Sequence, residues 1–61
     1  MLEVMLNIFN KFKSLSRENL KKELKKNEIP LKEIDMKLDV LLRNYCTRYK
    51  ESGEIMYFLK N

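Results

Sequence analysis

NYCTRYKESGEIMYFLKN, residues 44–61, is the stretch of sequence that decides the fold. Residues 46–50 are rich in β-forming types, and ESGE supplies a turn in which Gly53 provides the positive φ that a tight hairpin needs. A helix running through this stretch would hold Gly53 in its interior, at a cost of up to ~1 kcal/mol. The stretch therefore predicts a β-hairpin with strands at about 46–50 and 55–60. Its apolar residues alternate, with Ile55, Tyr57 and Leu59 on one face and Met56 and Phe58 on the other.

The beginning of the chain has the spacing of an amphipathic helix. Its apolar residues recur at intervals of three and one, which places them on one face: Leu2, Met5, Leu6, Phe9 and Phe12. Val4 and Ile8 widen this stripe, as in a helix that packs against more than one neighbour. The pattern predicts a helix over about 2–12.

A second helix is predicted over about 16–26. Leu15 lies between two serines and indicates a short extended link before it. Ser16 is a good N-cap, because its hydroxyl can accept from the first backbone N–H groups of a helix. Leu20 and Leu24 form a narrow inner edge, and Asn27 is expected to end the helix in the left-handed conformation.

A third helix is predicted over about 30–43. Pro30 suits the first turn of a helix, where its missing N–H leaves no bond unmade, and Asn44 is expected at the C-cap. An alternative is one long helix that continues to Lys50, because Tyr45 and Tyr49 can extend its apolar stripe. The expected core stripe consists of Leu31, Ile34, Leu38, Leu41 and Leu42.

Length and composition indicate one small globular domain. The 61 residues are 44% hydrophobic and 36% charged, and the net charge of +4 favours acidic partners such as nucleic acid. Cys46 is the only cysteine, which excludes an internal disulfide and fits a reducing compartment. The first residues, MLEVMLNIF, do not resemble a signal peptide, and no apolar run approaches the ~20 residues of a membrane span. We expect an intracellular protein, cytoplasmic or nuclear, with no membrane partner.

No catalytic constellation is visible in the sequence. The chain has no histidine to activate Cys46, and Gly53 is its only glycine, so no glycine-rich phosphate loop exists. Asp35 and Asp39 lie one helical turn apart, but two carboxylates without a third ligand make a weak metal site. The sequence therefore predicts no enzyme, no cofactor, no metal and no small-molecule substrate.

The order of helix, short link, helix, turn, helix and hairpin resembles a winged helix-turn-helix domain over essentially the whole chain. The resemblance rests on LSRENLKKEL (15–24), NEIPLKEIDMKLDVLLRN (27–44) and, for the wing, YCTRYKESGEIMYFL (45–59). It implies an α+β fold in which three helices are followed by a C-terminal β-hairpin, in a single domain over 1–61. Domains of this kind recur in transcription and replication machinery, both as regulators and as modules that dock subunits.

The outward face of the expected third helix leads to the first functional hypothesis. Three favourable i,i+4 charge pairs are expected, Glu28–Lys32, Glu33–Lys37 and Asp39–Arg43, each worth ~0.2–0.5 kcal/mol. Carboxylates on this helix would repel phosphates, whereas an exposed Met36–Val40 strip is typical of a protein contact. We therefore expect a non-enzymatic interaction module that docks a protein partner or a second copy; the alternative is that Met36 and Val40 have no role. The expected docking residues are Lys32, Glu33, Met36, Lys37, Val40 and Arg43.

The second hypothesis is a DNA-binding transcriptional regulator. A basic face on the second helix can hold phosphates by counterion release without reading the base sequence, and the wing adds two further cations. The simpler alternative is that these lysines only face solvent. The expected nucleic-acid-binding residues are Lys13, Arg17, Lys21, Lys22, Lys25, Lys26, Arg48 and Lys50.

Overall fold

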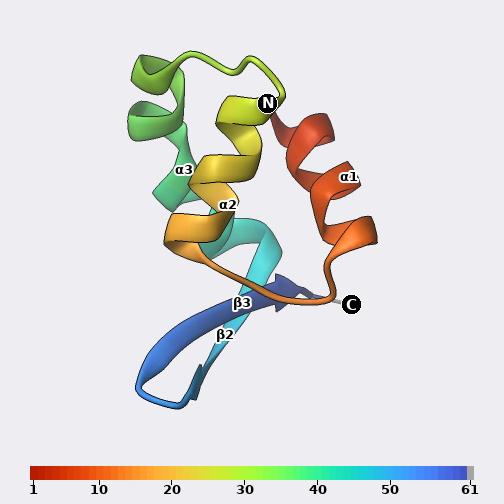
Figure 1. Ribbon diagram of the computed structural model, residues 1–61, viewed down its shortest axis with the longest axis vertical. Coiled ribbons are helices and arrows are strands. Elements are labelled where there is room, and N and C mark those ends of the chain that lie inside the picture. The colour runs from red at the N-terminus through yellow and green to blue at the C-terminus, as the bar shows by residue number, and fades with distance from the viewer. Residues whose placement is uncertain (61) are drawn as a thin grey trace.

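The computed structural model describes residues 1–60, which form three α-helices and one three-stranded antiparallel sheet (Figure 1). The α+β class predicted from the sequence is confirmed. Figure 1 shows the helices together at one end and the hairpin of β2 (Cys46–Glu51) and β3 (Glu54–Leu59) projecting away from them. The elements are α1 (Leu2–Lys11), β1 (Leu15–Ser16), α2 (Arg17–Lys26), α3 (Leu31–Tyr45), β2 (Cys46–Glu51) and β3 (Glu54–Leu59).

The predicted hairpin is confirmed, and the alternative of one long helix is wrong. The backbone turns from helical to extended at Cys46, with φ −125° and ψ 153°, so α3 ends at Tyr45. The two central turn residues, Ser52 and Gly53, have φ of 50° and 80°. Positive φ at both positions is the geometry of a two-residue hairpin turn whose twist matches that of the strands.

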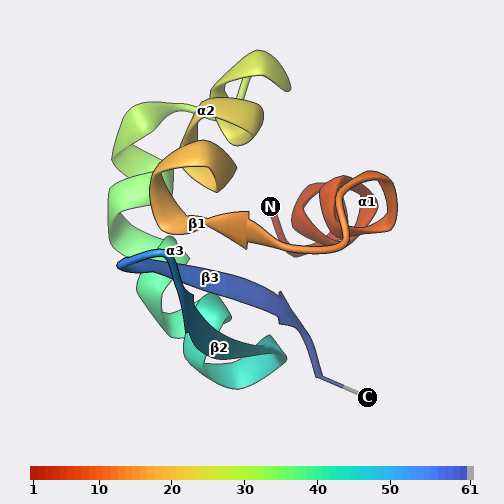
Figure 2. The ribbon, with the colours of Figure 1, turned by 60° about the horizontal axis from the view of Figure 1, so that its bottom comes forward.

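Residues 15–16, which link α1 to α2, also form the short strand β1. Leu15 pairs with Tyr57 and Ser16 with Met56, so β1 lies along β3 and the strand order is β1-β3-β2 (Figure 2). The extended conformation was predicted but the pairing was not, because two residues carry no periodicity. Ser16 also caps α2, as predicted: its Oγ accepts from the backbone N–H of Asn19 at 3.1 Å.

Two predicted helix ends are wrong by one or two residues. Asn27 is not left-handed (φ −90°); Glu28 takes that role with φ 64°. The N–H of Glu28 donates to Lys25 O and the N–H of Ile29 to Leu24 O, the two bonds of a Schellman cap. Asn44 lies inside α3 rather than at its C-cap, which is Cys46.

The core lies between the three helices and the inner side of the sheet. Leu31 and Phe12 are wrongly predicted core residues, with 47% and 40% of their surface exposed. Both lie at a helix end: Leu31 opens α3 beside the exposed Pro30, and Phe12 is extended after α1. Within residues 1–60, no helix is long and apolar enough to cross a membrane. The buried hydrophobic residues are Met5, Ile8, Phe9, Leu15, Leu20, Leu24, Ile34, Leu38, Leu42 and Cys46.

Candidate nucleic-acid interface

Two carboxylates of α3 are bound by cations of α2. Arg17 Nε donates to Asp39 Oδ1 at 2.8 Å, and Lys21 Nζ lies 3.2 Å from Asp35 Oδ1. The bond from Arg17 lowers the pKa of Asp39, and the bond to Asp39 raises the pKa of Arg17. Exposed pairs of this kind contribute at most ~1 kcal/mol to stability. Their main effect here is to cancel charge where α2 and α3 meet.

These ion pairs correct the i,i+4 pairs expected within α3. Asp39 bonds Arg17 across 22 residues instead of Arg43, and Glu28 precedes the helix, so it does not pair with Lys32. The expected Glu33–Lys37 pair is present, but with a long separation of 3.9 Å. The i,i+4 spacing predicts pairs within a single helix. Asp39 instead binds Arg17, which lies closer to it on the neighbouring helix α2.

The predicted basic face of α2 is consequently smaller than the sequence indicates. Arg17 and Lys21 are paired with α3, and Lys26 pairs with Glu23 at 3.1 Å. Lys22 and Lys25 take part in no ion pair with another of the described residues, and Lys13, which precedes the helix, does not either.

The outward face of α3 is exposed, as its spacing predicted. Met36 and Val40 have 68% and 49% of their surface exposed. The exposed side chains of Lys32, Lys37 and Arg43 surround them, and Glu33 is half-buried. This face therefore offers an apolar centre with cations at its edges.

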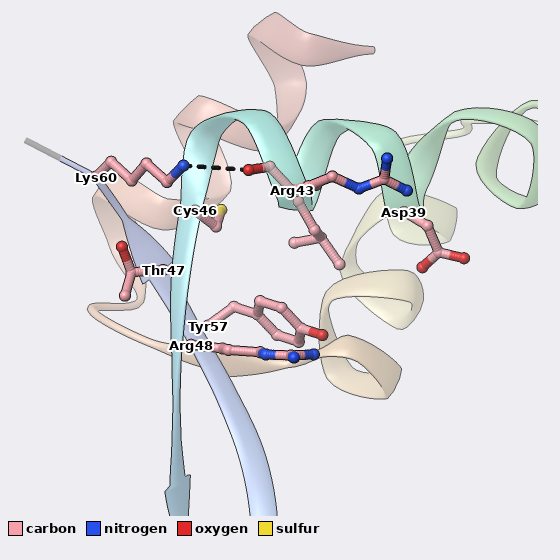
Figure 3. Close-up of a pocket in the computed structure, with 8 residues that line it drawn as sticks. Asp39, Arg43, Cys46, Thr47, Arg48, Tyr57 and Lys60 are labelled. Atoms are coloured by element: carbon pink, nitrogen blue, oxygen red, sulfur yellow. Dashed lines mark hydrogen bonds between the residues drawn. The ribbon is translucent and has the colours of Figure 1, made fainter.

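A groove of about 680 Å³ lies between the C-terminal half of α3 and the hairpin (Figure 3). Three cations from separate elements line it: Arg43 from α3, Arg48 from β2 and Lys60 after β3. Among the described residues, none of the three takes part in an ion pair. The Tyr57 side chain and the Asp39 carboxylate, which Arg17 binds, line the same groove. We call Arg43, Arg48 and Lys60 with Tyr57 the cationic groove.

Local bonds hold the cationic groove together. Lys60 Nζ donates to the backbone oxygen of Arg43 at 3.2 Å, the bond drawn in Figure 3, and Lys60 N donates to Tyr45 O at 2.9 Å. An ammonium group beside the last carbonyls of a helix is favoured by the helix dipole. Arg48 and Tyr57 face each other across β2 and β3, so their side chains lie on the same side of the hairpin.

Cys46 also lines the groove, at the point where α3 passes into β2. The residue is buried, and this burial raises the pKa of its thiol, while Lys60 acts in the opposite direction. A raised pKa keeps the thiol protonated at neutral pH, which makes it a poor nucleophile. Over residues 1–60, no three side chains of the types that bind metals come together.

Arg43 and Arg48 were predicted from the sequence as site residues, but on two different surfaces, and Lys60 was not predicted. The pairing register of β2 and β3 brings these three residues together. Cys46 pairs with Leu59 and Arg48 with Tyr57, which brings the residue after β3 back beside the end of α3. The chain itself matches no protein-family model, no curated protein and no solved structure.

Proposed function

We propose that the chain is a winged-helix domain that binds double-stranded nucleic acid through the cationic groove and the adjoining face of α3. The order α1, β1, α2, α3, β2, β3 and the strand order β1-β3-β2 support the winged-helix assignment. In this assignment α3 is the helix that enters the major groove and the β2–β3 hairpin is the wing. A role in transcription or replication belongs to the same proposal.

The observation that carries the proposal is the convergence of Arg43, Arg48 and Lys60 on one groove. Phosphate binding requires cations that are not already neutralised, and within residues 1–60 no carboxylate forms an ion pair with these three. Arginine can bind a phosphate with two parallel N–H groups, and the neighbouring Tyr57 hydroxyl can donate a further bond. The contacts expected from the groove are to the nucleic-acid backbone, which carries no information on base sequence.

The ion pairs between α2 and α3 weaken an objection to DNA binding. The carboxylates of α3 would repel phosphates, but Asp35 and Asp39 are held by Lys21 and Arg17. Of the lysines on the outward face, Lys37 is paired with Glu33 at 3.9 Å, whereas Lys32 is exposed and forms no ion pair with another described residue. In the major groove, apolar side chains such as Met36 and Val40 can contact thymine methyl groups, which gives at most a modest base preference.

Salt dependence tests the proposal directly. The three phosphate contacts of the cationic groove predict a slope of at least about −2.7 in log K against log salt, so affinity should fall at least ~40-fold between ~50 and ~200 mM salt. The measurement is fluorescence anisotropy of a labelled random-sequence DNA duplex titrated with the chain. An absence of binding at ~50 mM salt, or an affinity that does not change with salt, would overturn the proposal.

A second candidate function is protein docking through the outward face of α3. The observation that favours it is the exposure of Met36 and Val40, one turn apart on the same helix. Methionine is common at adaptable protein-binding surfaces, and adjoining exposed apolar side chains are typical of interaction sites.

Met36→Asp with Val40→Asp is expected to reduce binding of a protein partner at least tenfold, because it places two charges in the centre of an apolar contact. The measurement is the amount of each partner recovered by affinity capture with the wild-type chain and with the variant. Leu31→Asp is the matched control, because Leu31 is on the same helix and has a similar exposed fraction of 47%. Equal recovery with the wild type and the double variant would exclude docking through this face.

A further inference from the structure

The face of the hairpin that points away from the cationic groove is apolar and exposed. Side chains alternate along a strand, so Tyr49 lies on the side opposite to Arg48, together with Met56 and Phe58 of β3. The Tyr49 and Phe58 rings lie 5.7 Å apart, with 38% and 37% of their residues' surface exposed. Tyr49 is fixed in place because its hydroxyl donates to Ser14 Oγ at 3.0 Å. We call Tyr49, Met56 and Phe58 the aromatic face.

The aromatic face has a basic end and an acidic end. Lys13 lines a hollow of about 440 Å³ with Tyr49 and Phe58, close to the helices. At the other end, beside the hairpin turn, Glu51 and Glu54 lie on the same side as Tyr49 and Met56 by strand alternation. The surface therefore runs from positive through aromatic to negative along the hairpin.

The two glutamates form an unfavourable pair. Glu51 and Glu54 are directly opposite each other in the register of β2 and β3, where like charges destabilise a hairpin. None of the cations in residues 1–60 forms an ion pair with either of them. A positive charge supplied from outside the chain would relieve their repulsion.

We propose that the aromatic face binds a second copy of the chain, in a two-fold dimer with the hairpins antiparallel. A two-fold axis requires a surface that is complementary to itself. A patch with one basic and one acidic end meets this requirement, because in an antiparallel pair the basic end of each copy faces the acidic end of the other. The aromatic faces stack at its centre. Lys13 of each copy then reaches Glu51 and Glu54 of the partner, so the contact is made twice.

A second copy fits this face better than nucleic acid does, because Glu51 and Glu54 would repel phosphates. The dimer also leaves the cationic groove accessible, since Arg48 lies on the opposite side of β2 from Tyr49. Dimerisation is independent of the proposed function: it can be present without DNA binding, and DNA binding can be present without it. A patch of this size, built on one hairpin, predicts a weak dimer of the size class below ~1,200 Å².

The first test is sedimentation equilibrium of the whole chain at ~50 mM salt, over a concentration range up to ~1 mM. Wild type should dimerise with a dissociation constant of ~10–500 µM, and Tyr49→Thr with Phe58→Thr should weaken this at least tenfold. A wild type that stays monomeric at ~1 mM overturns the proposal. An unchanged dimer in the Tyr49→Thr and Phe58→Thr variant overturns it as well.

A charge exchange tests the antiparallel arrangement with surface variants that leave the core unchanged. Lys13→Glu alone, and Glu51→Lys with Glu54→Lys alone, should each weaken dimerisation about tenfold. An equimolar mixture of the two variants should restore it, because every contact across the axis then joins opposite charges again. Failure of the mixture to associate more tightly than either variant alone would overturn the arrangement.

Discussion

Leu38→Ala is expected to lower the free energy of unfolding by about 3 kcal/mol, a large effect for a single substitution. Leu38 lies in the middle of α3, is fully buried and belongs to the hydrophobic cluster that the helices share with the sheet. Truncation removes buried methyl and methylene groups and leaves a cavity, because packed neighbours relax only in part.

This loss is severe for so small a domain. At ~0.05–0.15 kcal/mol per residue, a chain of 61 residues has a total stability of roughly 3–9 kcal/mol. A loss of about 3 kcal/mol therefore leaves roughly 0–6 kcal/mol, so the variant loses between a third and all of the domain's stability. Urea denaturation followed by circular dichroism measures the change as a shift of the midpoint, provided that the slope of the transition stays the same.

Leu31→Ala is the matched control. The sequence placed Leu31 and Leu38 in the same core stripe, but Leu31 has 47% of its surface exposed. Its truncation should cost less than ~0.5 kcal/mol, as surface substitutions usually do. Similar losses for both variants would mean that Leu31 is packed in the core, and would contradict the structure at the start of α3.

Elements with a clear period were predicted well. The helical stripes of residues 2–11 and 31–45 and the alternation from Ile55 to Leu59 each repeat over several residues, so no single position decides them. The hairpin turn was predicted because only a glycine adopts the φ of Gly53 at little cost. The wrongly predicted core residues lie at helix ends. Leu31 and Phe12 continue the apolar stripe of their helices, but the neighbouring elements leave much of their surface exposed there.

Contacts between distant residues could not be predicted from spacing. Arg17 and Asp39 are 22 residues apart, and their bond depends on how α2 and α3 pack together. The sequence therefore overestimated the basic face of α2 and the carboxylate repulsion on α3. The cationic groove needed the register of β2 and β3 as well, because this register brings Lys60 to the end of α3.

Reversing two charges in the cationic groove should have the second large effect. Arg43→Glu with Arg48→Glu is expected to weaken DNA binding on the order of 100-fold at ~50 mM salt, because two phosphate contacts are lost and replaced by repulsion. The salt slope should become shallower by about 2, one for each lost contact. Anisotropy titrations at several salt concentrations give both values. Lys60 is left unchanged, since its bond to the Arg43 carbonyl also fastens the end of β3 to α3.

Lys22→Glu with Lys25→Glu is the control that separates the cationic groove from total charge. Each pair of reversals changes the net charge by −4, from +4 to 0, so long-range attraction falls equally in both variants. Lys22 and Lys25 lie on α2, outside the groove, and the control should lose less than about fivefold in affinity.

Equal losses of affinity in the two variants would mean that only net charge matters. A larger loss in the control would place the binding surface on α2, as the lysine pattern of the sequence predicted. Only a loss concentrated in the Arg43 and Arg48 variant assigns the phosphate contacts to the groove between α3 and the hairpin.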